Sequence, residues 1–136
     1  MKIAAVYCVY NEDEYIEYSI RSIDDFVDHI LVLLGTQPYT AYNARAREEF
    51  QQADRTEAIV TALAATHPKI RLIKGAWDSE LEHRNAALPF CRAERADYYF
   101  LVDGDEVYRR DHLENLRQEL LAHPETGQFI IKCDIF

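Results

Sequence analysis

The residues best suited to chemistry are two aspartates that flank a glycine, Asp103, Gly104 and Asp105. They follow an apolar run at residues 98–102, so they would lie on a turn at the end of a buried strand. Two carboxylates one residue apart can face the same hard divalent cation, and the glycine lets the backbone bend. Asp and Gly also form ordinary solvated turns, but with Glu106 added the three crowded acids repel one another unless a cation or hydrogen bonds offset the repulsion. The motif therefore predicts a Mg²⁺ or Mn²⁺ site held by Asp103 and Asp105.

Two more polar clusters follow apolar runs. Tyr10, Asn11 and Glu12 close the first run of the chain, and Gly35 and Thr36 follow the second. In an open α/β sheet, ligands bind beyond the carboxyl ends of the strands. All three clusters are therefore expected to meet at one edge of the sheet.

Alternating apolar and amphipathic segments predict the elements that would position these clusters. Helices are expected at residues 12–26, capped by Asn11, and at 54–66, 80–93 and 111–122. Residues 39–52 read as a loop with a short exposed helix. Buried strands are expected at residues 2–10, 29–34, 70–74, 98–102 and 127–135. This alternation predicts an α/β fold, a mostly parallel Rossmann-like sheet with helices on both faces.

Length and composition limit the functional classes. The 136 residues fit a single domain, 1–136, with a polar insertion at about 39–53. The formal net charge of −9, with no basic run, argues against nucleic-acid binding. An acidic protein that binds a diphosphate needs a cation between the two. Three cysteines without metal-ligand spacing indicate buried thiols in a reducing compartment, and no segment reads as a signal peptide or membrane span, so we expect a cytoplasmic protein.

Three segments, taken in order, resemble the GT-A family 2 glycosyltransferases. They are a strand followed by Tyr10-Asn11-Glu12, the stretch His83-Arg84-Asn85-Ala86-Ala87, and a strand followed by Asp103-Gly104-Asp105. The resemblance spans essentially the whole chain. It implies a GT-A fold and an enzyme that transfers a sugar, with inversion, from a nucleotide-diphosphate donor to an acceptor hydroxyl, using Mn²⁺ or Mg²⁺.

The resemblance also implies roles for individual residues. Asp105 matches the metal-ligating acid, and Asp103 matches the first acid of the motif, which contacts ribose or metal. Arg84 matches a basic residue that reaches the nucleotide, although an ion pair with Glu80 or Glu82 explains it equally well. The loop that wraps the nucleoside is matched by Cys8, Tyr10, Asn11 and Glu12.

Two features depart from the family pattern. The family has an Asp-Gly-Ser-like turn after the second strand, whose acid binds the base, whereas this chain reads Gly35-Thr36 there. Asp54-Arg55-Thr56 comes only after the polar insertion. The family's general base and acceptor site lie in a second half, so we expect a front half truncated after the metal motif. Glu106 and Asp134 are the nearest unassigned acids, and neither is assigned as the base.

Other functional classes stay open. A non-catalytic nucleotide- or sugar-binding module would need no base. The acidic motif also resembles the nucleophile motif of haloacid-dehalogenase phosphatases, although that motif belongs on a first strand. A sheet edge left exposed by a missing half would favour homo-oligomers. Trp77 could stack on a base or sugar, but a lone tryptophan more often closes the edge of a core.

Overall fold

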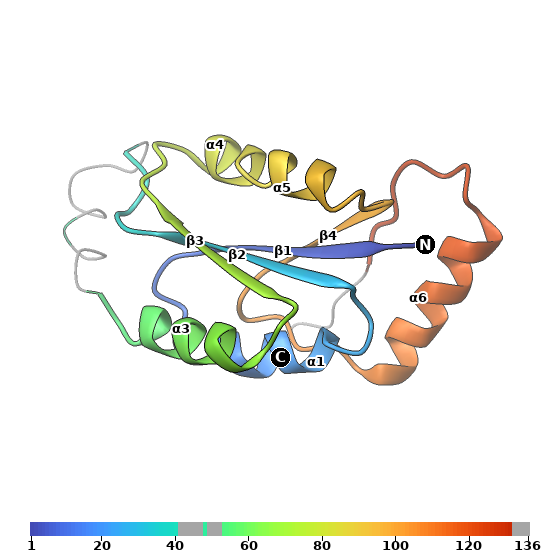
Figure 1. The fold of residues 1–136 in the computed structure, drawn as a ribbon, viewed down its shortest axis with the longest axis horizontal. Helices are drawn as coiled ribbons and strands as arrows, with labels where there is room; N and C mark the ends of the chain where they lie inside the picture. Colours follow the sequence, from blue (N-terminus) through green and yellow to red (C-terminus); the bar gives the residue numbers. More distant parts are fainter. Residues whose placement is uncertain (41–47, 49–52, 132–136) are drawn as a thin grey trace.

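A four-stranded parallel sheet forms the centre of the protein (Figure 1). The computed structural model describes residues 1–40, 48 and 53–131. Each pair of neighbouring strands is parallel, in the order β3-β2-β1-β4. The strands are β1 (Ile3–Val9), β2 (His29–Gly35), β3 (Ile70–Gly75) and β4 (Tyr98–Val102). The predicted α/β fold with a parallel sheet is confirmed, and these strands lie where the apolar runs placed them.

The burial of the strands explains the sequence pattern. β1 and β2 lie in the middle of the sheet, covered on both faces, so they are continuous apolar runs. β4 lies at an edge, where Phe100 and Val102 are buried while Tyr99 and Leu101 are exposed. Successive residues of β1 face two separate cores. The larger contains Ile3, Ala5, Tyr7 and Val9, and the smaller contains Ala4 and Val6.

Helices cover both faces of the sheet (Figure 1). α4 and α5 lie on one face, where Ala87 and Cys91 complete the smaller core. The opposite face carries α1 and α3, and α6 contributes Leu113 and Leu120 to the same large core. The helices are α1 (Ile16–Ile23), α3 (Thr56–Thr66), α4 (Glu80–Asn85), α5 (Leu88–Ala93) and α6 (Arg110–Ala122).

The helix predicted at residues 80–93 is divided in two. α4 ends at Asn85 and α5 begins at Leu88, with Pro89 in its first turn. Proline has no backbone N–H and its ring crowds the preceding turn, so a continuous helix would be strained at this point. The division makes α4 a separate short helix beside the carboxyl ends of β2 and β3.

The predicted cap at Asn11 is wrong. α1 begins five residues later, at Ile16, and its N-cap position, Tyr15, makes no side-chain capping bond. Asn11 instead adopts a left-handed conformation with φ of 54°, which asparagine tolerates better than most residues. Its side-chain oxygen accepts a hydrogen bond from the backbone N–H of Asp54 at 3.3 Å. Asn11 therefore shapes the loop after β1.

The strand predicted at residues 127–135 is not found where the structure can test it. Residues 127–131 contain no strand, and residues 132–135, with Cys133 and Asp134, lie outside the described part. Phe129 and Ile131 pack against the large core without joining the sheet. The short helix expected within residues 39–52 falls largely on residues that are not described.

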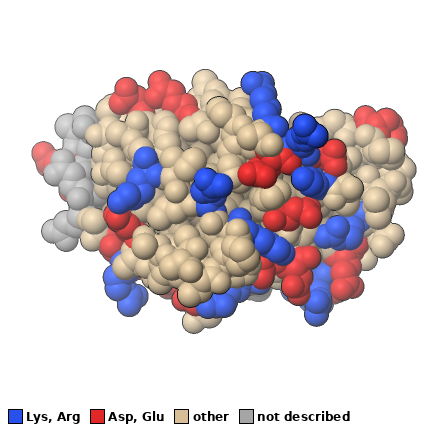
Figure 2. All heavy atoms as spheres, viewed as in Figure 1, with Lys and Arg blue, Asp and Glu red and all other residues tan. Residues whose placement is uncertain are grey.

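The surface carries charges of both signs. On the face shown in Figure 2, Lys and Arg side chains lie among Asp and Glu side chains, separated by uncharged residues. Among the described residues, no helix has the length and apolar character needed to cross a membrane.

Candidate functional site

The predicted polar clusters meet at the carboxyl ends of β1, β2 and β4, on the left in Figure 1. Residues 103–106, here called the acidic turn, follow β4 and face the loop after β1. Between them lies a cavity of about 540 Å³, here called the acidic cavity. It is lined by Asn11, Glu12, Asp13, Glu14, Tyr15, Asp103, Gly104 and Asp105.

Glu106 holds the acidic turn in shape. Its carboxylate accepts hydrogen bonds from the backbone N–H of Asp103 at 3.1 Å and from the hydroxyl of Tyr108 at 2.8 Å. Its own backbone N–H donates to the carbonyl of Asp103 at 3.1 Å. The side chain of Glu106 is therefore committed to the turn, which sequence reasoning did not anticipate.

Two buried hydroxyl groups, from Ser19 and Tyr7, support the acidic turn from the core side. The Ser19 hydroxyl donates to the carbonyl oxygen of Asp103 at 3.4 Å, and the Tyr7 hydroxyl lies 3.0 Å from Ser19 Oγ. Both side chains are fully buried, and burial raises the pKa of Tyr7 far above its ordinary value. Because Tyr7 stays protonated, it can donate to Ser19 while Ser19 donates onward. This relay ties the acidic turn to β1 and α1.

Glu12 packs directly against Gly104. A methyl group added at Gly104 would overlap the Glu12 carboxylate, so the Glu12 side chain would have to move to admit any larger residue. Burial, and then the charges of Asp105 and Asp103, raise the pKa of Glu12 to about 7. Hydrogen bonds from the backbone at Gly104 and Tyr10 oppose this rise. The three carboxyl groups therefore form one strongly interacting cluster.

The pKa of Asp103 is raised as well. Burial is the main cause that raises the pKa of Asp103, followed by the charge of Glu106, while Arg84 opposes the shift. The guanidinium of Arg84 also forms an ion pair with Glu80 at 2.8 Å. Both interpretations of Arg84 thus have a basis, since it pairs with a helix neighbour and its charge reaches the acidic turn.

Between pH 4.5 and 7, the protein is expected to lose stability as the pH rises. The unfolded chain releases the Glu12 proton near its ordinary value of 4.5, whereas the folded protein keeps it up to about 7. The folded state binds more protons in this window, so the free energy of unfolding falls by about 2 kcal/mol after allowance for solvent screening. Urea denaturation with chelator present should show the free energy of unfolding falling with pH in the wild type and falling less in Glu12→Gln. Equal slopes in the two proteins would contradict the prediction.

The acidic turn fits a metal ion that shares its coordination with a phosphate. Among the described residues, no three His, Cys, Asp or Glu side chains are placed to hold an ion by themselves. Mg²⁺ is usually bound by one or two carboxylates together with water and substrate phosphates. Asp103 and Asp105, which line one cavity, could supply such a partial set of oxygen ligands. Burial, followed by repulsion from neighbouring acids, raises the pKa values of Glu12 and Asp103, and a divalent cation would offset the repulsive part.

Asp54 has a structural role in the loop after β1. One of its carboxylate oxygens accepts a hydrogen bond from the backbone N–H of Asp13 at 3.0 Å. The other accepts from the backbone N–H of Thr56 at 2.8 Å. The Glu12 backbone N–H donates to the Thr56 hydroxyl oxygen at 2.7 Å. The Asp54-Arg55-Thr56 segment therefore fixes the loop that carries Glu12.

A second cavity, here called the aromatic pocket, lies beside the acidic cavity and shares Glu12 with it. Its volume is about 180 Å³. Sequence reasoning placed Cys8, Tyr10 and Glu12 near a nucleoside, and these three lie in its wall. The complete lining is Cys8, Tyr10, Glu12, Gly35, Gln37, Pro38, Tyr39, Trp77 and His83. Burial raises the pKa of the Cys8 thiol to about 11, so Cys8 acts as a small apolar wall residue.

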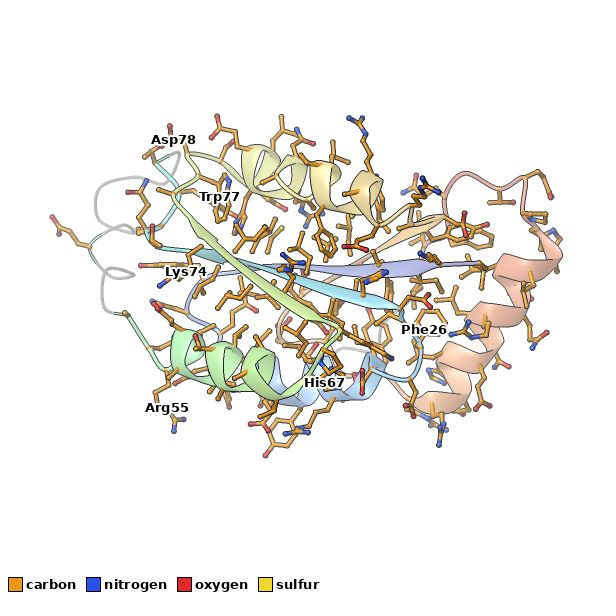
Figure 3. The ribbon with its side chains drawn as sticks, viewed as in Figure 1. Phe26, Arg55, His67, Lys74, Trp77 and Asp78 are labelled. Atoms are coloured by element: carbon orange, nitrogen blue, oxygen red, sulfur yellow. The ribbon has the colours of Figure 1, made fainter. Side chains whose placement is uncertain are left out.

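Trp77 both closes a core edge and lines the aromatic pocket, beside the carboxyl end of β3 and below α4 (Figure 3). Its ring stacks on His83 with centroids 4.0 Å apart and planes 12° apart. A methyl group added at Gly75 would come within 2.8 Å of the Trp77 ring. The glycine at the end of β3 is the sequence signal for this ring, because only glycine leaves room there.

His83 holds the walls of the pocket together. It is buried, and its Nε2 lies 2.9 Å from the carbonyl oxygen of Leu33, which can only accept. Nε2 therefore carries the proton, and Nδ1 accepts from the Tyr39 hydroxyl at 2.9 Å. Burial lowers the pKa of His83, which favours this neutral form. Sequence reasoning noted His83 but missed Tyr39.

No protein-family model and no curated protein matches this chain. Among solved structures, it is similar to the crystal structure of S. aureus TarS 1–349, with a TM-score of 0.62 and 18% sequence identity. The similarity covers 91% of this chain and 33% of that chain, so this chain spans about a third of its length. At this identity, the likeness establishes the fold alone.

Proposed function

We propose that this chain binds the donor in a glycosyltransferase that moves a sugar from a nucleotide diphosphate to an acceptor hydroxyl. The observation that carries the proposal is the pairing of an aromatic pocket with an acidic cavity, with Glu12 in the wall of both. An aromatic pocket suits a base, and an acidic turn with a metal ion suits a diphosphate. TarS, whose structure resembles this chain over a third of TarS 1–349, is a GT-A-type glycosyltransferase.

Within this proposal, Asp103 and Asp105 hold Mn²⁺ or Mg²⁺. The ion, when bound, would offset charge on the leaving diphosphate. Arg84 adds a positive charge near Asp103, and Cys8, Tyr10 and Asn11 belong to the strand end and loop that surround the nucleoside. Inversion at the sugar carbon follows from the family resemblance.

The general base is not assigned. Glu106 is close to the acidic turn, but its carboxylate is occupied by Asp103 and Tyr108. Because the chain spans about a third of TarS 1–349, the acceptor side of the reaction is also a proposal. The commitment of the Glu106 carboxylate to the acidic turn favours a binding module without transfer activity as the second candidate.

Calorimetric titration of UDP, GDP and dTDP, with Mn²⁺ and with chelator, tests donor binding. We expect at least one nucleotide to bind only when the metal is present. No binding of any nucleotide under either condition would overturn the proposal. If a nucleotide does bind, slow hydrolysis of the corresponding nucleotide-sugar would support a transferase. Metal-dependent binding without hydrolysis would support the binding module.

A further inference from the structure

We infer that the aromatic pocket accepts a single-ring pyrimidine base and excludes purines. This inference rests on the proposed function and identifies the class of donor nucleotide. It depends on the size of the pocket, the rigidity of its walls and the polar groups that face it.

The size of the pocket matches one six-membered ring. Its volume is about 180 Å³. A protein cavity of about 150 Å³ is known to hold benzene, so this pocket has room for one substituted ring and little more. A purine has a second ring fused to the first. This volume does not hold both rings, so the second ring would lie outside the pocket unless a wall moved.

The walls that a purine would have to move are held firmly. Trp77 is stacked on His83 and lies over Gly75. His83 is fixed in turn by the carbonyl of Leu33 in the central strand β2 and by the hydroxyl of Tyr39. Displacing Trp77 would break the ring stack and uncover the smaller core. His83 is therefore a positioning residue that keeps the pocket narrow.

The polar groups of the pocket suit a base without choosing among the pyrimidines. Gln37 contributes an amide that can both donate and accept a hydrogen bond. Uracil, thymine and cytosine each present a donor beside an acceptor on one edge, and so do guanine and adenine. Because an amide matches all of these, the discrimination against purines comes from size.

Calorimetry of the full chain with Mn²⁺ tests the inference, using UDP, CDP, dTDP, GDP and ADP. At least one pyrimidine nucleoside diphosphate should bind at least about tenfold more tightly than GDP or ADP. Metal-dependent binding of GDP or ADP with equal or higher affinity would overturn the inference and leave the proposed function standing. No binding of any nucleotide would overturn the proposed function itself.

Two variants locate the discrimination in the pocket. Trp77→Leu removes an aromatic wall and should bring the UDP and GDP affinities to within about threefold of each other. Gly35→Ala should weaken UDP binding about tenfold by narrowing the pocket. The backbone at Gly35 accepts a side chain, since its φ is not positive and an added methyl group would lie 3.5 Å from Tyr10 and Val9. Leu81→Ala, at an exposed position of α4, is the control and should change neither affinity.

A ratio of UDP to GDP affinity that is unchanged in Trp77→Leu would mean that Trp77 serves only the core, and the inference would fail. Trp77 is also the single tryptophan of the sequence, so its fluorescence reports on this pocket alone. Emission should change on addition of a pyrimidine nucleotide with Mn²⁺. A bound nucleotide that leaves the emission unaltered would place the base elsewhere and contradict the inference.

Discussion

Asp105→Ala is expected to reduce metal-dependent nucleotide binding on the order of 100-fold or more, because even residues that only support metal ligands cost 10 to 100-fold when changed. The same change should leave the metal-free protein at least as stable at pH 8. Asp105 is one of the charges that raise the pKa of Glu12, so its removal relieves repulsion. Loss of binding together with retained stability is the combination expected of a functional residue.

Calorimetry and urea denaturation of the same preparation measure both effects. Glu119→Ala is the matched control, because Glu119 is an exposed acid on α6 that pairs with His123, the residue directly after the helix. The control should keep wild-type nucleotide affinity. If Asp105→Ala keeps wild-type metal-dependent nucleotide affinity, Asp105 is not a metal ligand.

Gly104→Ala is expected to destabilise the protein by about 1–3 kcal/mol and to weaken nucleotide binding as well. The added methyl group overlaps the carboxylate of Glu12, which must leave its place against the acidic turn. The φ of Gly104 is not positive, so the loss comes from this overlap and not from the backbone. The shape of both cavities should change, since Glu12 lines each of them.

A double-mutant cycle with Glu12→Ala isolates this contact. If the overlap is the cause, Gly104→Ala should cost little stability once the Glu12 side chain is removed. Gly127→Ala is the control for adding a methyl group to a glycine, because nothing lies within 4 Å of the new carbon. Equal urea midpoints for wild type and Gly104→Ala would show that Glu12 moves aside without cost.

The sheet and the acidic turn could be predicted because their signals are local. The run Tyr98–Val102 is apolar and ends at an acid, and the strand stops at that point. Continuous apolar runs likewise identified β1 and β2, which are covered on both faces. The cap at Asn11 failed because the side chain found a partner in Asp54, far along the chain.

The aromatic pocket could not be predicted because its walls come from separate segments. Tyr39, Trp77 and His83 are brought together by the end of β3, the start of α4 and a hydrogen bond to Leu33. No pattern within any one segment indicates that three rings will meet. The role of Glu106 was equally hidden, since it depends on the position of Tyr108 relative to the turn.

The position of Glu12 in the wall of both cavities has a thermodynamic consequence. A cation beside Asp103 and Asp105 and a base beside Trp77 would both act on this one carboxyl group, so their binding would be linked through it. Linkage is reciprocal, and the factor by which Mn²⁺ tightens nucleotide binding must equal the factor by which the nucleotide tightens Mn²⁺ binding. Protons enter the same balance, because a cation beside Asp103 and Asp105 would favour the ionised form of Glu12 and release its proton. The protein would then bind the metal more tightly when the nucleotide is present, and the nucleotide more tightly when the metal is present.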